Sequence, residues 1–460
     1  MHTANGNTTP MHTATGTYLP ISTGDEAWTA EVTENSLPEA FGTVSVNNGP
    51  NVPLWKTFTS FVGPGAMIAV GYMDPGNWST SIAGGSAYGY SLLFVVLTSS
   101  LISMFLQCLA VRQGLATERD LAQACRDTYP RWLVLVIWIM MEVAIVATDL
   151  AEVIGSAVAL KLLFGLPLIY GVVITALDVI IILFTNGKSF RLLEGIVASL
   201  VVLITVCFSV QIGFSKPNGI QVFSGFLPSA PIFANKDELL IAVGIIGATV
   251  MPHNLFLHSS LVLTRDINRD DIDAVKQAMK YFTVDSNISL SIALFVNAAI
   301  LIVAASTFHV NGYEQVATLE EAHSLLTPIL GSFASVLFAV ALLAAGQNST
   351  LTGTLAGQIV MEGFMRMKIR PVFRRMATRL LAILPAVLVL AIFGEELANQ
   401  LLIISQVVLS VALPFAVFPL CHISSDPKKM GIHVNSIFTK YTAYIIASLL
   451  LGLDIYLLCF

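Results

Sequence analysis

The sequence MDPGNW at residues 73–78 decides the fold, because it interrupts an apolar run that is otherwise long enough to cross a bilayer. Pro75 lacks a backbone N–H and Gly76 adds backbone freedom, so the pair predicts a helix break. A break within a membrane is tolerated only where it lines a cavity inside the protein. This one also carries Asn77 and Asp74, whose burial costs about 2.5–3.5 kcal/mol on insertion scales. The alternative is a simple proline kink with Asp74 near the membrane surface, but a breaker joined to a carboxylate and an amide favours a binding site.

A second apolar run is interrupted in the same way by ATVMPHN at residues 248–254. Pro252 predicts the break, with Met251 before it and His253 after it. Either side chain alone is more typical of core packing. Two interrupted spans that lie five spans apart, however, are typical of inverted-repeat transporters, in which the substrate binds where the breaks meet near the midplane.

The composition indicates a multi-pass membrane protein. Apolar residues make up 55% of the chain and charged residues 11%, with a mean hydropathy of +0.78, whereas soluble domains carry about 25% charged residues. The chain has no basic face or basic tail, so a nucleic-acid partner is not expected. The five cysteines are scattered, without CxxC or CxxH spacing, and are expected to be packing residues and not a disulfide framework or a zinc site.

The apolar runs predict an all-α protein with eleven transmembrane helices. The expected spans are roughly 57–86, 89–111, 132–160, 166–184, 192–214, 239–263, 282–305, 328–347, 376–394, 397–420 and 439–459. They form a single transmembrane domain over residues 56–460. Its parts are repeat one (about 56–214), repeat two (about 238–420) and an extra span at 439–459. The small polar stretch at 346–354 resembles a helix-packing or cytoplasmic re-entry segment more than a binding loop.

The basic residues predict the orientation. Of the 23 Lys and Arg residues, all but Lys161, Lys216 and Lys236 fall on one side of the membrane if the spans alternate. That side is expected to be the cytoplasm, which places the N-terminus inside and the C-terminus outside, most simply at the cell (plasma or inner) membrane. Residues 1–55 contain no Lys or Arg and no apolar core segment, so they are expected to be a disordered acidic tail and not a signal peptide.

The two breaks together offer an unusual set of metal ligands. It comprises the carboxylate of Asp74, the amide oxygen of Asn77, the thioether of Met251 and freed carbonyls near Gly71 and Ala248. Oxygen ligands alone would suit Ca²⁺ or Mg²⁺. A thioether gives those hard ions little, and so favours Mn²⁺, Fe²⁺, Co²⁺ and Cd²⁺ relative to them. The methionine is therefore expected to act as a filter against more abundant ions.

The third span carries three acids on one helical face: Glu142, Asp149 and Glu152. Acids within a span are costly and indicate a polar pathway, for which a proton relay is the natural use. Arg374 and Arg375, at the start of the ninth span, are candidate partners, and His253 titrates in the right range. Asp74 could itself release a proton when metal arrives. A structural ion-pair network is the alternative.

These motifs resemble the Nramp family of divalent metal transporters. The resemblance covers roughly residues 57–459 and includes ATDLAE at 147–152 and GTLAGQ at 353–358. It implies a LeuT-like fold of eleven or twelve spans that moves metal with protons into the cytoplasm by alternating access. The methionine matches the transition-metal branch of the family, and eleven spans without a long glycosylated loop resemble bacterial members, which mostly import Mn²⁺.

The resemblance also implies roles for individual residues. Asp74, Asn77 and Met251 would hold the metal by side chain, together with the carbonyl of Ala248 and, in outward states, that of Gly71. Gln406 would join in some states. Protons would pass by Asp149 and Glu152 toward Arg374 and Arg375, from a start near His253.

Three other functions have different sequence requirements. A sodium-coupled organic-solute symporter of the same fold class would need exposed helix-end amides for its substrate and no thioether–carboxylate pair. A membrane hydrolase would need a nucleophile–base pair or an HExxH site, which the sequence lacks, so the chain is not expected to be an enzyme. A passive channel is disfavoured by the paired breaks. The expected partners are divalent metal ions, protons and lipid, with no resident cofactor and no obligate protein partner. Mn²⁺ and Fe²⁺ differ little in ligand preference, so both remain candidates.

Overall fold

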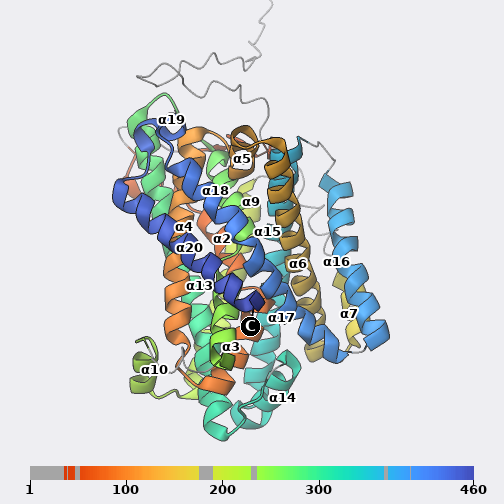
Figure 1. The fold of residues 1–460 in the computed structure, drawn as a ribbon. Helices are drawn as coiled ribbons and strands as arrows, with labels where there is room; N and C mark the ends of the chain where they lie inside the picture. The colour runs from red at the N-terminus through yellow and green to blue at the C-terminus, as the bar shows by residue number, and fades with distance from the viewer. Residues whose placement is uncertain are drawn as a thin grey trace, which may run out of the picture.

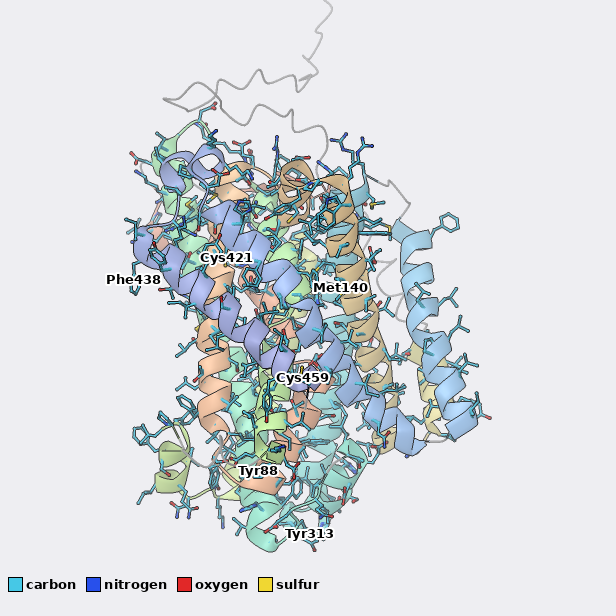
Figure 2. All side chains as sticks on the ribbon, viewed as in Figure 1. Tyr88, Met140, Tyr313, Cys421, Phe438 and Cys459 are labelled. Carbon is cyan, nitrogen blue, oxygen red and sulfur yellow. The ribbon has the colours of Figure 1, made fainter. Side chains whose placement is uncertain are left out.

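The computed structural model describes residues 36–38, 40–46, 52–175, 190–228, 236–316, 318–366, 371–393 and 395–459. Long helices run side by side between the two ends of the molecule (Figure 1). Figure 1 shows α5 (Leu121–Thr128) and α19 (Pro427–Met430) at one end, with α10 (Gly219–Gly225) and α14 (Leu319–Leu330) at the other. Tyr88 and Tyr313 also lie at the second end (Figure 2). Loops that the charge pattern assigns to opposite sides are therefore at opposite ends.

The first half of the chain begins with a span in three pieces. Its helices are α1 (Leu54–Phe61), α2 (Pro64–Gly71), α3 (Pro75–Tyr88), α4 (Leu93–Thr117), α5, α6 (Arg131–Phe164), α7 (Leu168–Thr175) and α9 (Phe190–Ser215). Pro64 and Pro75 each stand at the first position of a helix, where a missing N–H costs nothing. The predicted break at Pro75 is present, and a second interruption at Val62–Gly63 was not predicted.

The second half repeats the pattern of a broken leading helix. Its elements are α11 (Lys236–Thr249), α12 (Pro252–Leu261), η2 (Val262–Thr264), β2 (Arg265–Asp266), α13 (Ile272–Thr307), η3 (His309–Asn311), α14, α15 (Ser332–Met365), α16 (Pro371–Phe393), α17 (Glu395–Ala412), α18 (Pro414–Ser424), α19, η4 (Gly431–His433) and α20 (Ile437–Cys459). The predicted break before Pro252 is present. Pro414 divides the tenth predicted span, an interruption that the sequence analysis missed.

Eight helices in the described ranges are long and apolar enough to cross a membrane. Each coincides with one of the predicted spans. Three predicted spans remain. The first is in pieces, α7 is the described part of the fourth, and α16 corresponds to the ninth. The all-α membrane architecture is confirmed, and the total of eleven spans stays a prediction.

Two predicted boundaries are wrong. Helix α13 begins ten residues before the expected 282, and α15 continues to Met365, past the expected end at 347. The polar stretch at 346–354 is therefore helix interior and not a re-entry segment. Its small residues allow close packing, since a Cβ at Gly346 would lie 2.2 Å from Ser156 Oγ on α6.

The structure describes residues 36–38, 40–46 and 52–55 of the N-terminal segment, and the prediction of disorder for residues 1–55 stays a prediction. Strand β1 (Val44–Ser45) pairs in parallel with β2, with Val44 opposite Arg265. Leu37 is buried, and the Ser36 hydroxyl donates to Asp120 Oδ2 at 2.5 Å. Ser36 therefore contacts the N-terminal end of α5, and β1 contacts the segment after α12.

The outer face of α6 shows how the bundle meets lipid. Leu135, Ile139 and Val143 follow one another at helical spacing and are each about 45% exposed. On the same helix Asp149 and Glu152 are buried. The helix thus presents an apolar stripe to the bilayer and its acids to the protein interior.

Candidate functional site

The first break is organised around Asp74. This residue caps α3, where its Oδ1 accepts the backbone N–H of Asn77 at 2.8 Å. Both side chains are buried, and Asp74 Oδ2 and both amide atoms of Asn77 have no hydrogen-bond partner in the described protein. Pro75 also removes the N–H that would reach the carbonyl of Gly71 in a continuous helix.

The second break is organised around Met251, which stands at the N-cap position of α12 and is fully buried. Pro252 removes the N–H that would reach the carbonyl of Ala248 in a continuous helix. His253 follows within the first turn of α12, buried, with its Nδ1 lacking a hydrogen-bond partner among the described residues. The break therefore brings a thioether, a carbonyl and an imidazole to one short segment.

The two breaks lie against each other. A Cβ built on Gly71, at the end of α2, would fall 2.1 Å from Asn254 Nδ2 at the start of α12. On the other side, α17 contacts both breaks through Gln406. A Cβ on Gly76 would lie 1.7 Å from Gln406 Nε2, and one on Gly247 would lie 3.4 Å from the backbone oxygen of Gln406. The sequence-predicted pair of breaks and Gln406 are thus brought together.

Unsatisfied polar atoms concentrate here. Besides Asp74 and Asn77, Oε1 of Gln406 and both amide atoms of Asn254 are buried without a hydrogen-bond partner in the described protein. Leaving such atoms buried costs about 1–3 kcal/mol each, and the oxygen atoms among them are able to coordinate a cation. No group of three or more His, Cys, Asp or Glu able to hold a metal occurs in the described ranges. Any cation here would be held by mixed ligands and not by a conventional acidic or imidazole cluster.

Two of the three acids of α6 face one helix. A Cβ on Gly353 of α15 would lie 3.1 Å from Glu152 Oε1 and 3.5 Å from Asp149 Oδ1. Glu152 also accepts the hydroxyl of Ser349 at 2.7 Å. Glu142 is about 10 Å further along the helix axis and accepts the indole N–H of Trp138 at 3.0 Å. The structure therefore pairs Asp149 with Glu152 and leaves Glu142 two turns away.

The side chains of Arg374 and Arg375 lie outside the described part of the structure, which gives only their helical backbone in α16. Helix α16 packs against α6, the helix that carries the acids. The predicted partnership between these arginines and the acids therefore stays a prediction.

Several buried polar residues beside the breaks were not predicted. Gln107 of α4 donates to the Tyr72 hydroxyl at 2.8 Å, and its Oε1 lies 3.0 Å from His258 Nδ1. Asn297 of α13 donates to the Tyr72 carbonyl at 2.7 Å. His258 is thus hydrogen-bonded within the protein. Asn254 is a further unpredicted residue of this kind. Its position directly after Pro252 and His253 is the one sequence feature that could have placed it at the site.

A charged clamp holds the joint between α1 and α2. The buried guanidinium of Arg265 donates to the carbonyls of Ser60 and Val62 at 3.1 and 2.9 Å and pairs with Glu194 at 2.7 Å. From the other side, Asp285 Oδ2 accepts the N–H of Gly65 at 2.7 Å. Positive charge thus meets the C-terminus of α1 and negative charge the N-terminus of α2, as the helix dipoles favour.

A membrane bundle with two interrupted helices that meet at buried polar side chains belongs to the class of LeuT-like transporter folds. The solved structure of Mhp1, a nucleobase-cation-symport-1 family transporter, shares this fold with a TM-score of 0.57 over 86% of this chain and 91% of that one, at 15% identity. The family profile described as natural resistance-associated macrophage protein-like (Nramp) matches residues 65–460. The chain belongs to the Nramp family.

Relatives at higher identity cover nearly the whole chain. A protein of Listeria monocytogenes named divalent metal cation transporter MntH is 51% identical over 94% of this chain and 96% of its own length. The crystal structure of the Eremococcus coleocola manganese transporter, in complex with an aromatic bis-isothiourea substituted compound, superposes with a TM-score of 0.86. It is 42% identical and covers 92% of this chain and 90% of that one.

Proposed function

We propose that the protein is a transporter, not an enzyme, that imports divalent transition metal ions, Mn²⁺ or Fe²⁺ and also Co²⁺ or Cd²⁺, together with protons by alternating access. The observation that carries the proposal is the meeting of two helix breaks around buried, unpartnered oxygen atoms beside a buried thioether. Relatives named as divalent metal cation and manganese transporters support the substrate class.

In this proposal the metal is the substrate, held by Asp74, Asn77 and Met251. Asp74 supplies the one carboxylate, and its capping bond to the backbone of Asn77 leaves Oδ2 to face the ion. The carbonyls of Ala248 and, in outward states, Gly71 add neutral oxygens. The thioether disfavours Ca²⁺ and Mg²⁺, which gain little from sulfur.

Gln406 joins the metal in some states of the cycle. Its side chain already lies against Gly76 at the start of α3, and its Oε1 has no hydrogen-bond partner in the described protein. A movement of α17 relative to α3 would bring that oxygen to the ion.

Protons follow a separate route along α6. Asp74 releases a proton when the cation arrives, because a nearby positive charge favours the carboxylate. His253 lies near the start of the route, and Asp149 and Glu152 carry the proton toward Arg374 and Arg375. Glu142, two turns away along α6, would serve a later part of the same path.

We expect the protein to have the orientation in the membrane that the distribution of Lys and Arg predicts. The protein would lie in the cell membrane with its N-terminus in the cytoplasm and its C-terminus outside. It would need lipid, metal ions and protons as partners and no second protein. A sodium-coupled organic-solute symporter is the remaining alternative, since that class shares the fold.

The test is Mn²⁺ uptake into proteoliposomes that contain a metal-quenched dye, with and without an inward proton gradient and with excess external Ca²⁺. Uptake should rise with the gradient and resist Ca²⁺ in the wild type. In Met251→Ala it should become sensitive to Ca²⁺. Met141→Ala, which removes a methionine buried in α6, is the matched control and should keep the wild-type resistance. Folded wild-type protein without Mn²⁺ uptake would refute the proposal and favour the organic-solute symporter.

A further inference from the structure

The carbonyl groups of the first break fall into two classes. Pro75 leaves the carbonyl of Gly71 without its helical donor. The next two carbonyls, by contrast, are both occupied by side chains. Asn297 Nδ2 donates to the Tyr72 oxygen at 2.7 Å, and Trp78 Nε1 donates to the Met73 oxygen at 3.1 Å. The carbonyl directly before Asp74 is therefore held by an indole.

Trp78 is fixed in place for this bond. The residue is fully buried, one turn into α3, and its N–H reaches back across the break to Met73. Its ring meets Phe208 of α9 edge-on, with centroids 4.8 Å apart, and Phe338 of α15 at 5.3 Å. Contacts of this kind restrict the orientation of the indole. Two neighbouring helices thus enclose the ring, and the bond to the Met73 oxygen sets the direction of the N–H.

The Met73 carbonyl matters because of its neighbour in the chain. It directly precedes Asp74, so if it were free it would be a further hard oxygen in the same break as the carboxylate. Ca²⁺ takes six to eight oxygen ligands in flexible geometry, whereas Mn²⁺ is typical of octahedral sites with about six ligands. One more carbonyl at the site would therefore favour Ca²⁺ over Mn²⁺.

We propose that Trp78 is a specificity-determining residue that positions the break: its indole N–H withholds the Met73 carbonyl from the metal site. Together with the thioether of Met251, it keeps the number of hard oxygen ligands low. This inference rests on the metal site of the proposed function. It differs from that proposal in assigning selectivity to a residue that does not touch the ion.

The test measures binding and not transport, so that its failure is distinguishable from failure of the proposed function. Mn²⁺ and Ca²⁺ are titrated calorimetrically into detergent-purified protein, and the ratio of the two dissociation constants is compared between variants. Trp78→Phe keeps an aromatic ring and loses the N–H. Phe208→Leu disturbs the packing around the ring and keeps the N–H, so it is the matched control.

The expected result is a shift of the ratio toward Ca²⁺ by about three- to tenfold in Trp78→Phe, the size of one hydrogen bond. Phe208→Leu should stay within twofold of the wild type. Where Trp78→Phe does not fold, replacement of Trp78 by benzothienylalanine, which has sulfur in place of the N–H, supplies the measurement.

An unchanged ratio in folded protein without the N–H overturns the inference, as does an equal shift in Phe208→Leu. Wild-type protein that binds neither ion also overturns it, because no site would then exist. Wild-type protein that binds Mn²⁺ without transporting it refutes the proposed function alone, and the ratio still decides the role of Trp78.

Discussion

The joint between α1 and α2 offers the sharpest test of the structure. Gly63 has φ +135°, a region that residues with side chains rarely adopt, and a Cβ there would lie 2.4 Å from the carboxyl carbon of Glu194. That carboxylate cannot move away freely, since it is paired with Arg265 at 2.7 Å. Gly63→Ala should therefore destabilise the closed joint.

The magnitude follows from two contributions. A residue with a Cβ in a glycine-only backbone region costs about 1–3 kcal/mol. Displacing Glu194 adds to this cost, because breaking a buried ion pair completely costs about 3–5 kcal/mol. The backbone contribution alone shifts an equilibrium by about 5- to 150-fold toward states in which the joint has opened.

The assay uses a cysteine at Ser60, which is buried at this joint, in protein whose five native cysteines are replaced by alanine. Its labelling by a water-soluble maleimide should be at least fivefold faster in Gly63→Ala. Gly195→Ala is the control, because this helical glycine adjoins Glu194 and a Cβ there would meet nothing within 4 Å. Labelling of the Gly63 variant at the rate of the control would refute the reasoning.

Three further outcomes are expected. Gly155→Ala should abolish Mn²⁺ uptake, because its Cβ would lie 2.3 Å from Pro75 at the first break; uptake above half the wild-type rate would contradict this close contact. Ser349→Ala removes the 2.7 Å hydrogen bond to Glu152, so the pH at half-maximal uptake should move while the affinity for Mn²⁺ stays within twofold; an unmoved pH profile would argue against a proton role for this pair. Burial raises the pKa of the Cys125 thiol in α5, and since only the thiolate reacts, its labelling by maleimide should stay slow from pH 7 to 9. A tenfold gain per pH unit would mean that Cys125 is exposed.

The positions of both breaks could be predicted because their causes are local. Pro75 and Pro252 remove a donor wherever they stand in a helix, and the polar residues beside them have no reason to be in lipid. The adjacency of Asp149 and Glu152 followed in the same way from helical spacing. Glu142 shares their spacing, and it accepts a hydrogen bond from the indole of Trp138, one turn before it. Helical spacing predicts which residues share one face of a helix. It does not predict which neighbouring residues that face contacts.

The remaining features depend on contacts between distant segments. Asp285 and Gly65 are 220 positions apart, and Ser36 and Asp120 are 84 apart. Nothing in the sequence around Ser36 distinguishes it from the acidic stretch before it, so the N-terminal tail was predicted to be disordered throughout. The contacts of Ser36 and β1 are with α5 and β2, which are distant in the sequence.

These long-range contacts share one physical cause. A helix that stops inside a bundle leaves carbonyls and N–H groups that lipid cannot satisfy, so each interruption must recruit donors or acceptors from elsewhere in the chain. Asp285 takes the N–H groups that begin α2, Arg265 takes the carbonyls that end α1, and Asn297 and Trp78 take two carbonyls at the next break. Which backbone carbonyls remain without a hydrogen bond at a break therefore depends on which of these side chains are present. We therefore expect a substitution at one of these partners to alter the proposed metal site as directly as a substitution at a proposed ligand.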